Sequence, residues 1–388
     1  MKVKNFLIIV FVLLLSLSVS ISFLPIENKV VFADDDFDVN SYCLIDANSG
    51  TILKEKNSNL RHEVASMVKL MTCLLTMEKI EKNEWSLDTT LFVSEYAASM
   101  EGSQAFLDAG KSYKIDDLLK SVIVASANDS SVVLAEGFAG TENAFVEIMN
   151  NKAKELGLND TLYCNSTGLP AFNQYSTAYD IAKLLSIVSN HDLYKKYSSI
   201  WMDNLVHESG RVTELVNTNR LIKYYPGCEC GKTGFTDEAG YCLSVSAKRN
   251  DMKLISVVIG ARSSSDRFSI SSSLLNYGFS NFKSVKLVDK TITISTEEKI
   301  KGNKNFVECL PENDLYVIEK NGADNSKYEI KTNINKLQSP VHKGDVIGTI
   351  SVMSDNVCVS TTNLIAYDDY VTPSYMQIVQ QICSQWTA

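Results

Sequence analysis

Residues 64–80 read VASMVKLMTCLLTMEKI, and this stretch determines the centre of the fold. From Met67 to Ile80 the apolar residues fall on nearly every side of a helical projection. A helix that is apolar all round is buried in the middle of a domain. The stretch therefore predicts a buried helix that begins at a serine, Ser66, with a lysine, Lys69, about one turn further on.

Helix and strand patterns surround this buried helix. Helical spacing of apolar residues, with a period near 3.6, marks four further segments, whereas alternation or continuous apolar runs mark strands. The strand-like segments are 40–53, which is broken by a turn, 241–247 and 254–259, and the helical segments are 115–123, 143–156, 179–188 and 271–277. We therefore expect a mixed α/β domain over residues 34–284.

The sequence pattern changes after about residue 282. Short alternating runs are separated by Gly, Asn and Asp turns, as in a small β-sandwich. The runs are 285–294, 306–310, 315–319, 328–334, 346–352 and 357–365. They predict an all-β, sandwich-like domain over residues 285–372, with a boundary near residue 284.

The first 33 residues have the composition of a secretory signal peptide. Lys2 and Lys4 form a positive start, residues 6–24 are apolar apart from a few serines, and Val31-Phe32-Ala33 offers a cleavage site. An uncleaved membrane anchor is the alternative, because the apolar stretch is nearly long enough to span a bilayer. Cleavage is favoured because no stop-transfer flank follows. We therefore expect an exported, extracytoplasmic protein.

Charge and cysteine content exclude several classes of protein. The chain has a formal net charge of −9 and residues 1–33 carry +2, which leaves −11 on residues 34–388. So acidic a protein is a poor candidate for binding nucleic acid or anionic lipid by charge. The nine cysteines are odd in number, and neither a second close pair nor a His cluster accompanies Cys228-Glu-Cys230. We expect mostly thiols, no metal and no cofactor.

Three short motifs occur in a fixed order in the first domain. Ser66-Met-Val-Lys69 opens the buried helix, Ser126-Ala-Asn128 ends the next helix, and Lys232-Thr233-Gly234 precedes the strand pair. They resemble the S-x-x-K, S-x-N and K-T-G set of penicillin-binding proteins and serine β-lactamases. Single motifs are weak signals, since Ser280-Asn-Phe-Lys283 is a second S-x-x-K and Ser354-Asp-Asn356 is a literal S-D-N. Only the motifs at residues 66, 126 and 232 combine the expected order along the chain with the expected helix and strand surroundings.

The spacing of these motifs has a chemical reason. Residues three apart share a helix face, so Lys69 can reach the hydroxyl of Ser66. Serine needs an adjacent base to act as a nucleophile, and lysine can be that base only when its pKa falls well below ~10.4. Burial and a second cation, Lys232, both lower that pKa. Ser126 can relay the proton, Asn128 can bind a substrate amide, and the free N–H at the helix start can help form an oxyanion hole.

Longer stretches resemble the low-molecular-weight D,D-carboxypeptidases, the family of penicillin-binding protein 5. They are Leu44-Ile-Asp-Ala47, Val124-Ala-Ser-Ala-Asn-Asp129, Gly168-Leu-Pro170, Tyr175-Ser-Thr-Ala178, Lys232-Thr-Gly-Phe-Thr236 and Val341-His-Lys-Gly344. Two more, Asn217-Thr-Asn-Arg-Leu221 and Tyr225-Pro-Gly227, resemble the Gram-positive, sporulation-associated branch in particular. The likeness covers nearly all of residues 34–388.

This resemblance implies a fold and an activity. The fold is the penicillin-binding or serine β-lactamase-like transpeptidase domain, with a central antiparallel sheet flanked by helices. The activity is that of a serine D-alanyl-D-alanine carboxypeptidase, which removes the terminal D-alanine of peptidoglycan stem pentapeptides and binds β-lactam antibiotics covalently. Such a protein serves maturation of the cell wall or spore wall, at the wall or the outer face of the cytoplasmic membrane.

The resemblance also implies roles for individual residues. Ser66 attacks the penultimate D-Ala carbonyl, the terminal D-Ala leaves, and water hydrolyses the acyl-enzyme. Thr233, in the Lys232-Thr233-Gly234 motif, and Arg267 hold the terminal carboxylate, with Arg262 as the rival arginine. The N–H of Phe235 is the second oxyanion donor. The usual Pro-Ala-Ser-x-Thr-Lys of the family is Val-Ala-Ser-Met-Val-Lys here, a change that replaces no catalytic group.

Two other functions share parts of this pattern. A serine β-lactamase has the same trio, and in class A enzymes a glutamate assists deacylation. Glu155-Leu-Gly-Leu-Asn159 looks like such a glutamate motif, but it ends an amphipathic helix and is better explained as a solvated helix end. A catalytically weak peptidoglycan-binding scaffold is the non-enzyme alternative, although a binding protein has no need of a nucleophile and a base.

The last segment, residues 373–388, has the pattern of an amphipathic helix. Pro373 suits its start, and apolar residues from Met376 to Trp386 fall on one side of a helical wheel. Such a helix can lie on the outer face of the membrane through its apolar side. It carries no Lys or Arg, so peripheral membrane contact would be hydrophobic. Packing against the β-rich domain is the alternative.

Overall fold

The computed structural model describes residues 37–296, 307–322, 328–335, 337, 339–370 and the single positions 376, 379 and 383. The signal peptide expected at residues 1–33 lies outside the described residues, as does the helix expected at 373–388 apart from those three positions. Among the residues that are described, no helix combines the length and the apolar character needed to cross a membrane.

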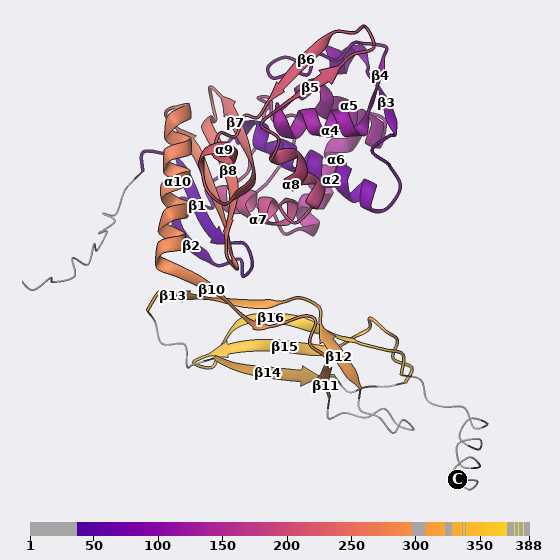
Figure 1. Ribbon diagram of the computed structural model, residues 1–388, viewed down its shortest axis with the longest axis vertical. Helices are drawn as coiled ribbons and strands as arrows, with labels where there is room; N and C mark the ends of the chain where they lie inside the picture. Colours follow the sequence, from indigo (N-terminus) through magenta and orange to yellow (C-terminus); the bar gives the residue numbers. More distant parts are fainter. Residues whose placement is uncertain are drawn as a thin grey trace, which may run out of the picture. The chain divides into compact units, whose positions relative to one another are not determined.

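A five-stranded antiparallel sheet organises residues 38–281, called here the α/β region (Figure 1). Its strand order is β2-β1-β9-β8-β7. Strand β1, from the start of the region, therefore pairs with β9, from near its end, and β7 forms one edge of the sheet. The helix α10 (Ser264–Asn281) lies along one face, and α7 (Ala178–Val188) with the remaining large helices covers the other. The strands are β1 (Ser41–Asp46), β2 (Ile52–Lys56), β7 (Cys228–Thr236), β8 (Gly240–Arg249) and β9 (Met252–Ala261). The predicted mixed fold with a central antiparallel sheet is confirmed.

The predicted buried helix occupies the centre of the helical layer. It begins with the 3-10 turn η1 (Ala65–Val68) and continues as α2 (Lys69–Glu81), in which every residue from Lys69 to Met77 is buried. Its apolar side chains join one core cluster with those of the surrounding helices. These helices are α3 (Glu95–Ala98), α4 (Ile115–Val124), α5 (Asn128–Ala139), α6 (Glu142–Glu155), α8 (Asp192–Ser198) and α9 (Leu221–Tyr224).

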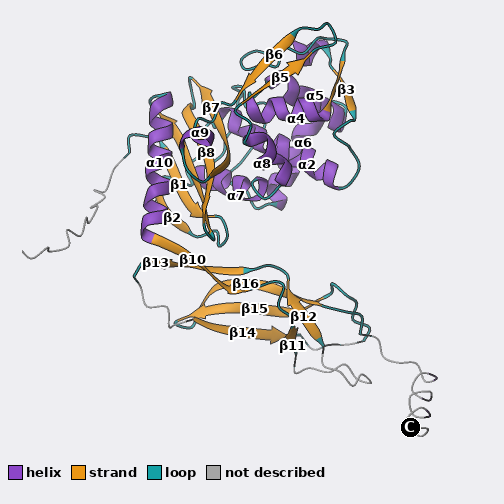
Figure 2. Ribbon diagram, in the orientation of Figure 1, coloured by secondary structure: helices purple, strands orange, loops and turns teal. Residues whose placement is uncertain are grey.

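Two short hairpins extend from the helical layer (Figure 2). One pairs β3 (Thr90–Phe92) with β4 (Ser112–Lys114), and the other pairs β5 (Met202–Val206) with β6 (Val212–Val216). The long connection between β3 and β4 runs from residue 93 to 111 and includes α3. The periodicity of the sequence predicted neither of these strand pairs nor the loops that connect their strands.

Residues 282–370 are called here the β region, and its described residues form strands joined by turns and loops, with no helix. One sheet has the order β11-β12-β16-β15-β14, and β10 pairs with β13 in a second one. A separate apolar cluster that includes Val307, Val317, Val352 and Leu364 fills this region. The strands are β10 (Phe282–Val288), β11 (Ile294–Ser295), β12 (Glu308–Pro311), β13 (Leu315–Lys320), β14 (Tyr328–Ile334), β15 (Val346–Ser354) and β16 (Val357–Ala366). The predicted β-rich character is confirmed.

The motif Ser354-Asp-Asn356 is a hairpin turn in this region. Asp355 and Asn356 have φ values of 49° and 66° between β15 and β16. Two-residue turns with positive φ at both central positions match the twist of the flanking strands, and Asp and Asn tolerate that conformation. The literal S-D-N therefore has a local backbone explanation.

Candidate active site

The backbone around Ser66 is packed tightly against two glycines. Ala65 has a φ of 47°, and Ser66 follows in η1 with its side chain half-buried. A β-carbon on Gly168 would lie 2.0 Å from the Ala65 carbonyl oxygen, and one on Gly234 would lie 3.2 Å from the Ser66 nitrogen. Only residues without a side chain permit this approach. Gly168 and Gly234 therefore fix the position of the Ser66 N–H and hydroxyl.

Lys69 lies beside Ser66, as the three-residue spacing predicts. Its Nζ is 2.9 Å from the Ser66 Oγ and donates to the Thr167 carbonyl at 2.5 Å. The side chain is fully buried, and burial, followed by the nearby Lys232 cation, lowers the pKa of Lys69 well below its ordinary value. A neutral lysine amine at this distance can accept the serine proton.

Ser126 and Lys232 form a second hydrogen-bonded pair. Lys232 Nζ donates to Ser126 Oγ at 2.7 Å and to the Thr233 carbonyl at 3.0 Å. Burial is the main cause that lowers the pKa of Lys232 to about 7, and the positive charge of Arg267 acts in the same direction. The Ser126 hydroxyl is therefore held by a group that can supply or take up a proton near neutral pH.

The backbone at Ser126 differs from the expected helix end. The helix α4 stops at Val124, Ser126 adopts a left-handed φ of 64°, and a new helix, α5, begins at Asn128. Asn128 donates from Nδ2 to the Glu101 carbonyl, while its Oδ1 is buried and has no protein partner among the described residues. This oxygen is available to accept from a substrate N–H.

The Lys232-Thr233-Gly234 motif precedes the expected strand pair, now β8 and β9, and itself lies inside a further strand, β7. These residues and Phe235 belong to β7, at the edge of the sheet next to η1. Thr233 donates from Oγ1 to the Thr218 hydroxyl at 2.7 Å. An edge strand leaves backbone N–H and C=O groups on its outer side free to pair with an extended chain. The motif thus presents both side chains and backbone to a ligand.

The two candidate arginines have different environments. Arg267 is buried at the start of α10, where it donates to the carbonyl of Gly234 at 3.0 Å and of Cys242 at 3.3 Å. Burial lowers its pKa, and its Nε has no partner among the residues described. Arg262 is largely exposed and pairs with Asp38. Arg267 is therefore the arginine that reaches the candidate site.

A cavity of about 380 Å³ joins most of these groups. Its walls include Ser66, Ser126, Asn128, Thr233, Gly234, Phe235 and Arg267, while the buried amines of Lys69 and Lys232 contact its two serine hydroxyls. The sequence reasoning missed the other lining residues as site residues. They are Gly102, Ser103, Gly168, Leu169, Thr218 and Thr236. Four of these six belong to the family-like stretches Gly168-Leu-Pro170, Asn217-Thr-Asn-Arg-Leu221 and Lys232-Thr-Gly-Phe-Thr236.

The arrangement suits acyl transfer to serine. A serine hydroxyl beside a buried lysine amine, a second serine–lysine pair and backbone N–H groups adjoin one cavity. Serine acyl transfer uses groups of these kinds as nucleophile, base, proton relay and oxyanion donors. No group of three His, Cys, Asp or Glu side chains suited to a metal ion occurs in the described ranges. The eight cysteines from Cys43 to Cys358 are free thiols. The fold and the site define a serine peptidase, a hydrolase.

Comparison with known proteins identifies the family. Residues 28–263 match the family model described as D-alanyl-D-alanine carboxypeptidase, and residues 282–372 match the C-terminal domain of penicillin-binding protein 5. The chain is 36% identical over 352 residues to the D-alanyl-D-alanine carboxypeptidase DacF of Bacillus subtilis, covering 90% of each chain. It belongs to the D-alanyl-D-alanine carboxypeptidase family of low-molecular-weight penicillin-binding proteins.

Other relatives agree with this assignment. The carboxypeptidase DacC of Escherichia coli is 32% identical, with 86% of this chain and 84% of the relative covered. The structure of penicillin-binding protein 5 from Haemophilus influenzae matches with a TM-score of 0.71 and 31% identity, over 85% of this chain and 97% of that one. The family resemblance inferred from the motifs is confirmed.

The β-lactamase alternative loses its structural basis. Glu155 is the last residue of α6, is exposed and pairs with Lys152 at 2.9 Å. It lines a separate surface pocket and not the cavity at Ser66. A carboxylate in that position cannot activate a water for an acyl group on Ser66. The β-lactamase and scaffold alternatives are not favoured.

Proposed function

We propose that this protein is a D-alanyl-D-alanine carboxypeptidase that acts through an acyl-enzyme on Ser66. The observation that carries the proposal is the 2.9 Å contact between the Ser66 hydroxyl and Lys69, an amine with a strongly lowered pKa. Lys69 takes the serine proton as Oγ attacks the penultimate D-Ala carbonyl. The N–H groups of Ser66 and Phe235 stabilise the oxyanion that forms.

The second pair of residues completes the first half of the reaction. Ser126 passes a proton to the amine of the leaving D-alanine, and Lys232, 2.7 Å from Ser126, replenishes it. A relay of this kind contributes roughly 10²–10⁴-fold to a rate. Water then hydrolyses the ester on Ser66. Lys69 gives its proton back to Ser66 Oγ, and the proton released by the attacking water restores Lys232 through Ser126.

Substrate selection rests on a carboxylate and an amide. Arg267 and Thr233 lie in the cavity wall and bind the terminal carboxylate, for which a buried guanidinium is well suited. Asn128 accepts from the amide N–H of the stem peptide through its unpaired Oδ1. β-Lactams carry both a carboxylate and a strained amide, so they acylate the same serine.

One experiment tests this function directly. The wild type is incubated with a pentapeptide ending in D-Ala-D-Ala and, separately, with a fluorescent penicillin. We expect D-alanine release and covalent labelling, and the loss of both in Ser66→Ala, while thermal unfolding stays unchanged. Turnover of penicillin without D-alanine release would restore the β-lactamase, and labelling without either turnover would indicate a scaffold.

We also propose the organisation and location of the chain. The division is a cleaved signal peptide at 1–33, a catalytic domain at 34–284, a β-rich domain at 285–372 and a C-terminal helix at 373–388. The separate family matches to 28–263 and 282–372, and the start of β10 at Phe282, support the middle boundary. The protein acts outside the cytoplasm, on the cell wall. N-terminal sequencing of the mature protein should begin at Asp34.

The C-terminal helix is proposed to contact the membrane through its apolar side. Cells that express the chain with and without residues 374–388 are fractionated, and the truncated protein should leave the membrane fraction. Salt should not release the full chain, because the segment has no Lys or Arg. An unchanged distribution would favour packing against the β-rich domain.

A further inference from the structure

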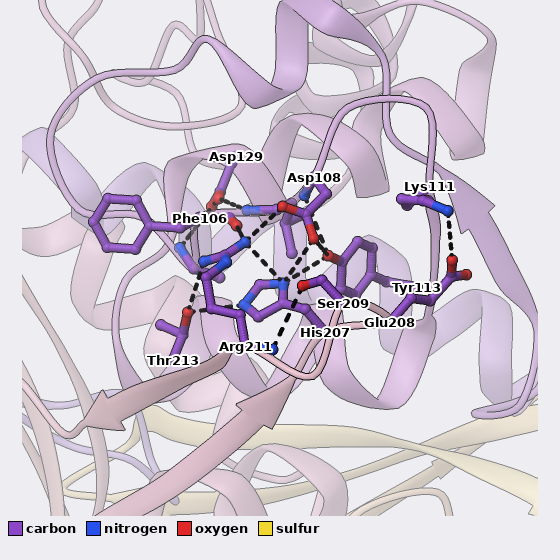
Figure 3. Close-up of polar contacts among 12 residues, drawn as sticks. Phe106, Asp108, Lys111, Tyr113, Asp129, His207, Glu208, Ser209, Arg211 and Thr213 are labelled. Carbon is purple, nitrogen blue, oxygen red and sulfur yellow. Dashed lines mark hydrogen bonds and ion pairs between the residues drawn. The ribbon is translucent and has the colours of Figure 1, made fainter.

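The hairpin β5–β6 fastens a loop that is distant in the sequence. From the base of its turn, Arg211 donates through Nη2 to the Phe106 carbonyl at 2.5 Å and to Asp108 Oδ1 at 2.7 Å (Figure 3). At the same turn Glu208 pairs with Lys111 at 2.8 Å. Hydrogen bonds to a charged donor are about twice as strong as neutral ones. The stretch from 106 to 111 is therefore tied to the hairpin at several points.

A buried histidine keeps Arg211 in place. The side chain of His207 is fully buried, with Tyr113 OH 2.7 Å from its Nδ1 and Thr213 Oγ1 2.8 Å from its Nε2 (Figure 3). Burial, together with the nearby Arg211 cation, lowers the pKa of His207, so the ring is neutral at neutral pH. His207 also contacts Arg211 directly, because Arg211 Nη2 lies 3.2 Å from His207 Nδ1. Arg211 Nη1 donates to the hydroxyl of Thr213, the residue that contacts Nε2, at 3.3 Å.

The same loop is also held by a buried carboxylate, that of Asp129, which follows Asn128 in the sequence. Asp129, which is fully buried, accepts from the N–H of Ala105 at 3.0 Å and of Leu107 at 3.0 Å. These two residues flank Phe106, which has a left-handed φ of 57° and is 57% exposed. That conformation is unfavourable for a bulky residue and persists only where the surroundings impose it. Asp129 and Arg211 together supply the restraint on both sides of Phe106.

The restrained loop forms a wall of the catalytic cavity. Its first part accepts two hydrogen bonds from Asn128, from N to the Ser103 carbonyl at 2.7 Å and from Nδ2 to the Glu101 carbonyl at 2.5 Å. Gly102 and Ser103 line the cavity together with Ser66. The orientation of the Asn128 amide therefore depends on where residues 101–108 lie. A chain of contacts runs from the hairpin through this loop to a substrate-binding group.

We propose that Arg211, seated by His207, is a positioning residue for the reaction: it holds residues 101–108 so that Ser103 and Asn128 face the substrate at Ser66. This inference rests on the proposed function, since it assumes that the cavity binds the peptide. Arg211 touches neither the cavity nor Ser66 and acts only through the loop. Loss of the Arg211 side chain frees residues 101–108 in the cavity wall to move, without removing a group that takes part in the reaction.

The test compares Arg211→Ala with Arg211→Lys and with the control Glu214→Ala. Glu214 is an exposed charged residue of β6 and alternates in direction with Thr213, which contacts the histidine. We expect Arg211→Ala to lower the second-order rate constant of penicillin acylation and the kcat/KM for D-alanine release about tenfold or more, since displacements near 1 Å cost up to ~10²-fold. Arg211→Lys should recover part of this loss, and Glu214→Ala should match the wild type.

A second measurement separates positioning from general stability. Hydrogen exchange of the amides of residues 101–108 should accelerate in Arg211→Ala, while thermal unfolding shifts little, because the Arg211 side chain is 41% exposed. Unchanged acylation in Arg211→Ala would overturn the inference, as would a loss of rate with unchanged exchange in the loop. If the wild type itself neither bound penicillin nor released D-alanine, the proposed function would fail instead.

Discussion

Replacing Gly168 by alanine should disable the nucleophile while leaving the fold in place. Gly168 has a φ of +81°, and an added β-carbon would lie 2.0 Å from the Ala65 carbonyl oxygen, at least about 1.4 Å short of the 3.4 Å at which ordinary contact begins. The Ala65–Ser66 backbone must therefore move by about 1 Å or more. A displacement of that size at a reacting group costs roughly 10²-fold in rate.

A matched control, Gly140→Ala, accounts for the energetic cost of placing an alanine in the left-handed backbone conformation. Gly140 has a φ of +83° at the end of α5, and nothing lies within 4 Å of the position of its absent β-carbon. Gly140→Ala and Gly168→Ala both force an alanine into the left-handed region, which costs about 1–2 kcal/mol. Only Gly168→Ala adds the collision with Ala65. The difference between the two variants therefore isolates the effect on Ser66.

The assay is the rate of covalent labelling by a fluorescent penicillin, followed on gels, together with thermal unfolding of each variant. We expect Gly140→Ala to label within about threefold of the wild type, and Gly168→Ala to label ~10²-fold more slowly while still unfolding cooperatively. Equal labelling rates for the two variants would show that the close approach of Gly168 does not position Ser66.

Four further predictions concern the charged and polar groups. Burial and the Lys232 cation lower the pKa of Lys69, so Lys232→Met should raise the pKa of Lys69. Because the neutral amine exists above its pKa, the rise of the acylation rate with pH should then move to higher pH. An unchanged pH profile would contradict the influence of Lys232 on the Lys69 pKa. Arg267→Ala should raise the KM for D-Ala-D-Ala peptides at least tenfold through loss of a charge-assisted bond worth ~1.5–3 kcal/mol, whereas an equal effect of the surface variant Arg262→Ala would reverse the assignment. Ser126→Ala should slow acylation by roughly 10²-fold or more, while Ser354→Ala, in a β-hairpin turn, should leave it unchanged. Glu155→Ala should keep acyl-enzyme hydrolysis within about twofold of the wild type, since Glu155 is a helix-end residue paired with Lys152; a large fall would revive the β-lactamase interpretation.

The main elements of the fold could be predicted because their periodicity is strong. The apolar run from Met67 to Ile80 forms the buried η1 and α2, and the runs at 241–247 and 254–259 form β8 and β9. Boundaries were less accurate. The helix expected at 271–277 extends over Ser264–Asn281, because its polar first turn is set by the Ser263 side chain, which accepts from the Asp266 N–H. Caps of this kind carry little hydrophobic signal.

Most of the candidate site could be predicted from motif order, whereas its walls could not. The pairing of Ser66 with Lys69 follows from helical spacing, but that of Ser126 with Lys232 joins residues 106 apart in the sequence. The left-handed turn at Ser126 and the placement of Lys232 inside β7 depend on tertiary contacts that periodicity does not contain. Gly102 and Ser103 reach the cavity through a loop whose position is set by Asp129 and Arg211.

The measurement that tests the central claim most directly is the location of the acyl group. Cleavage after Arg61 and Lys69 releases residues 62–69, HEVASMVK, in which Ser66 is the only hydroxyl and no cysteine is present. After brief reaction with penicillin, mass spectrometry of the tryptic digest should find the full mass of the antibiotic on this peptide alone. Modification of a peptide that contains Ser126 or Ser354 instead, with residues 62–69 unmodified, would contradict the assignment of Ser66 as the nucleophile.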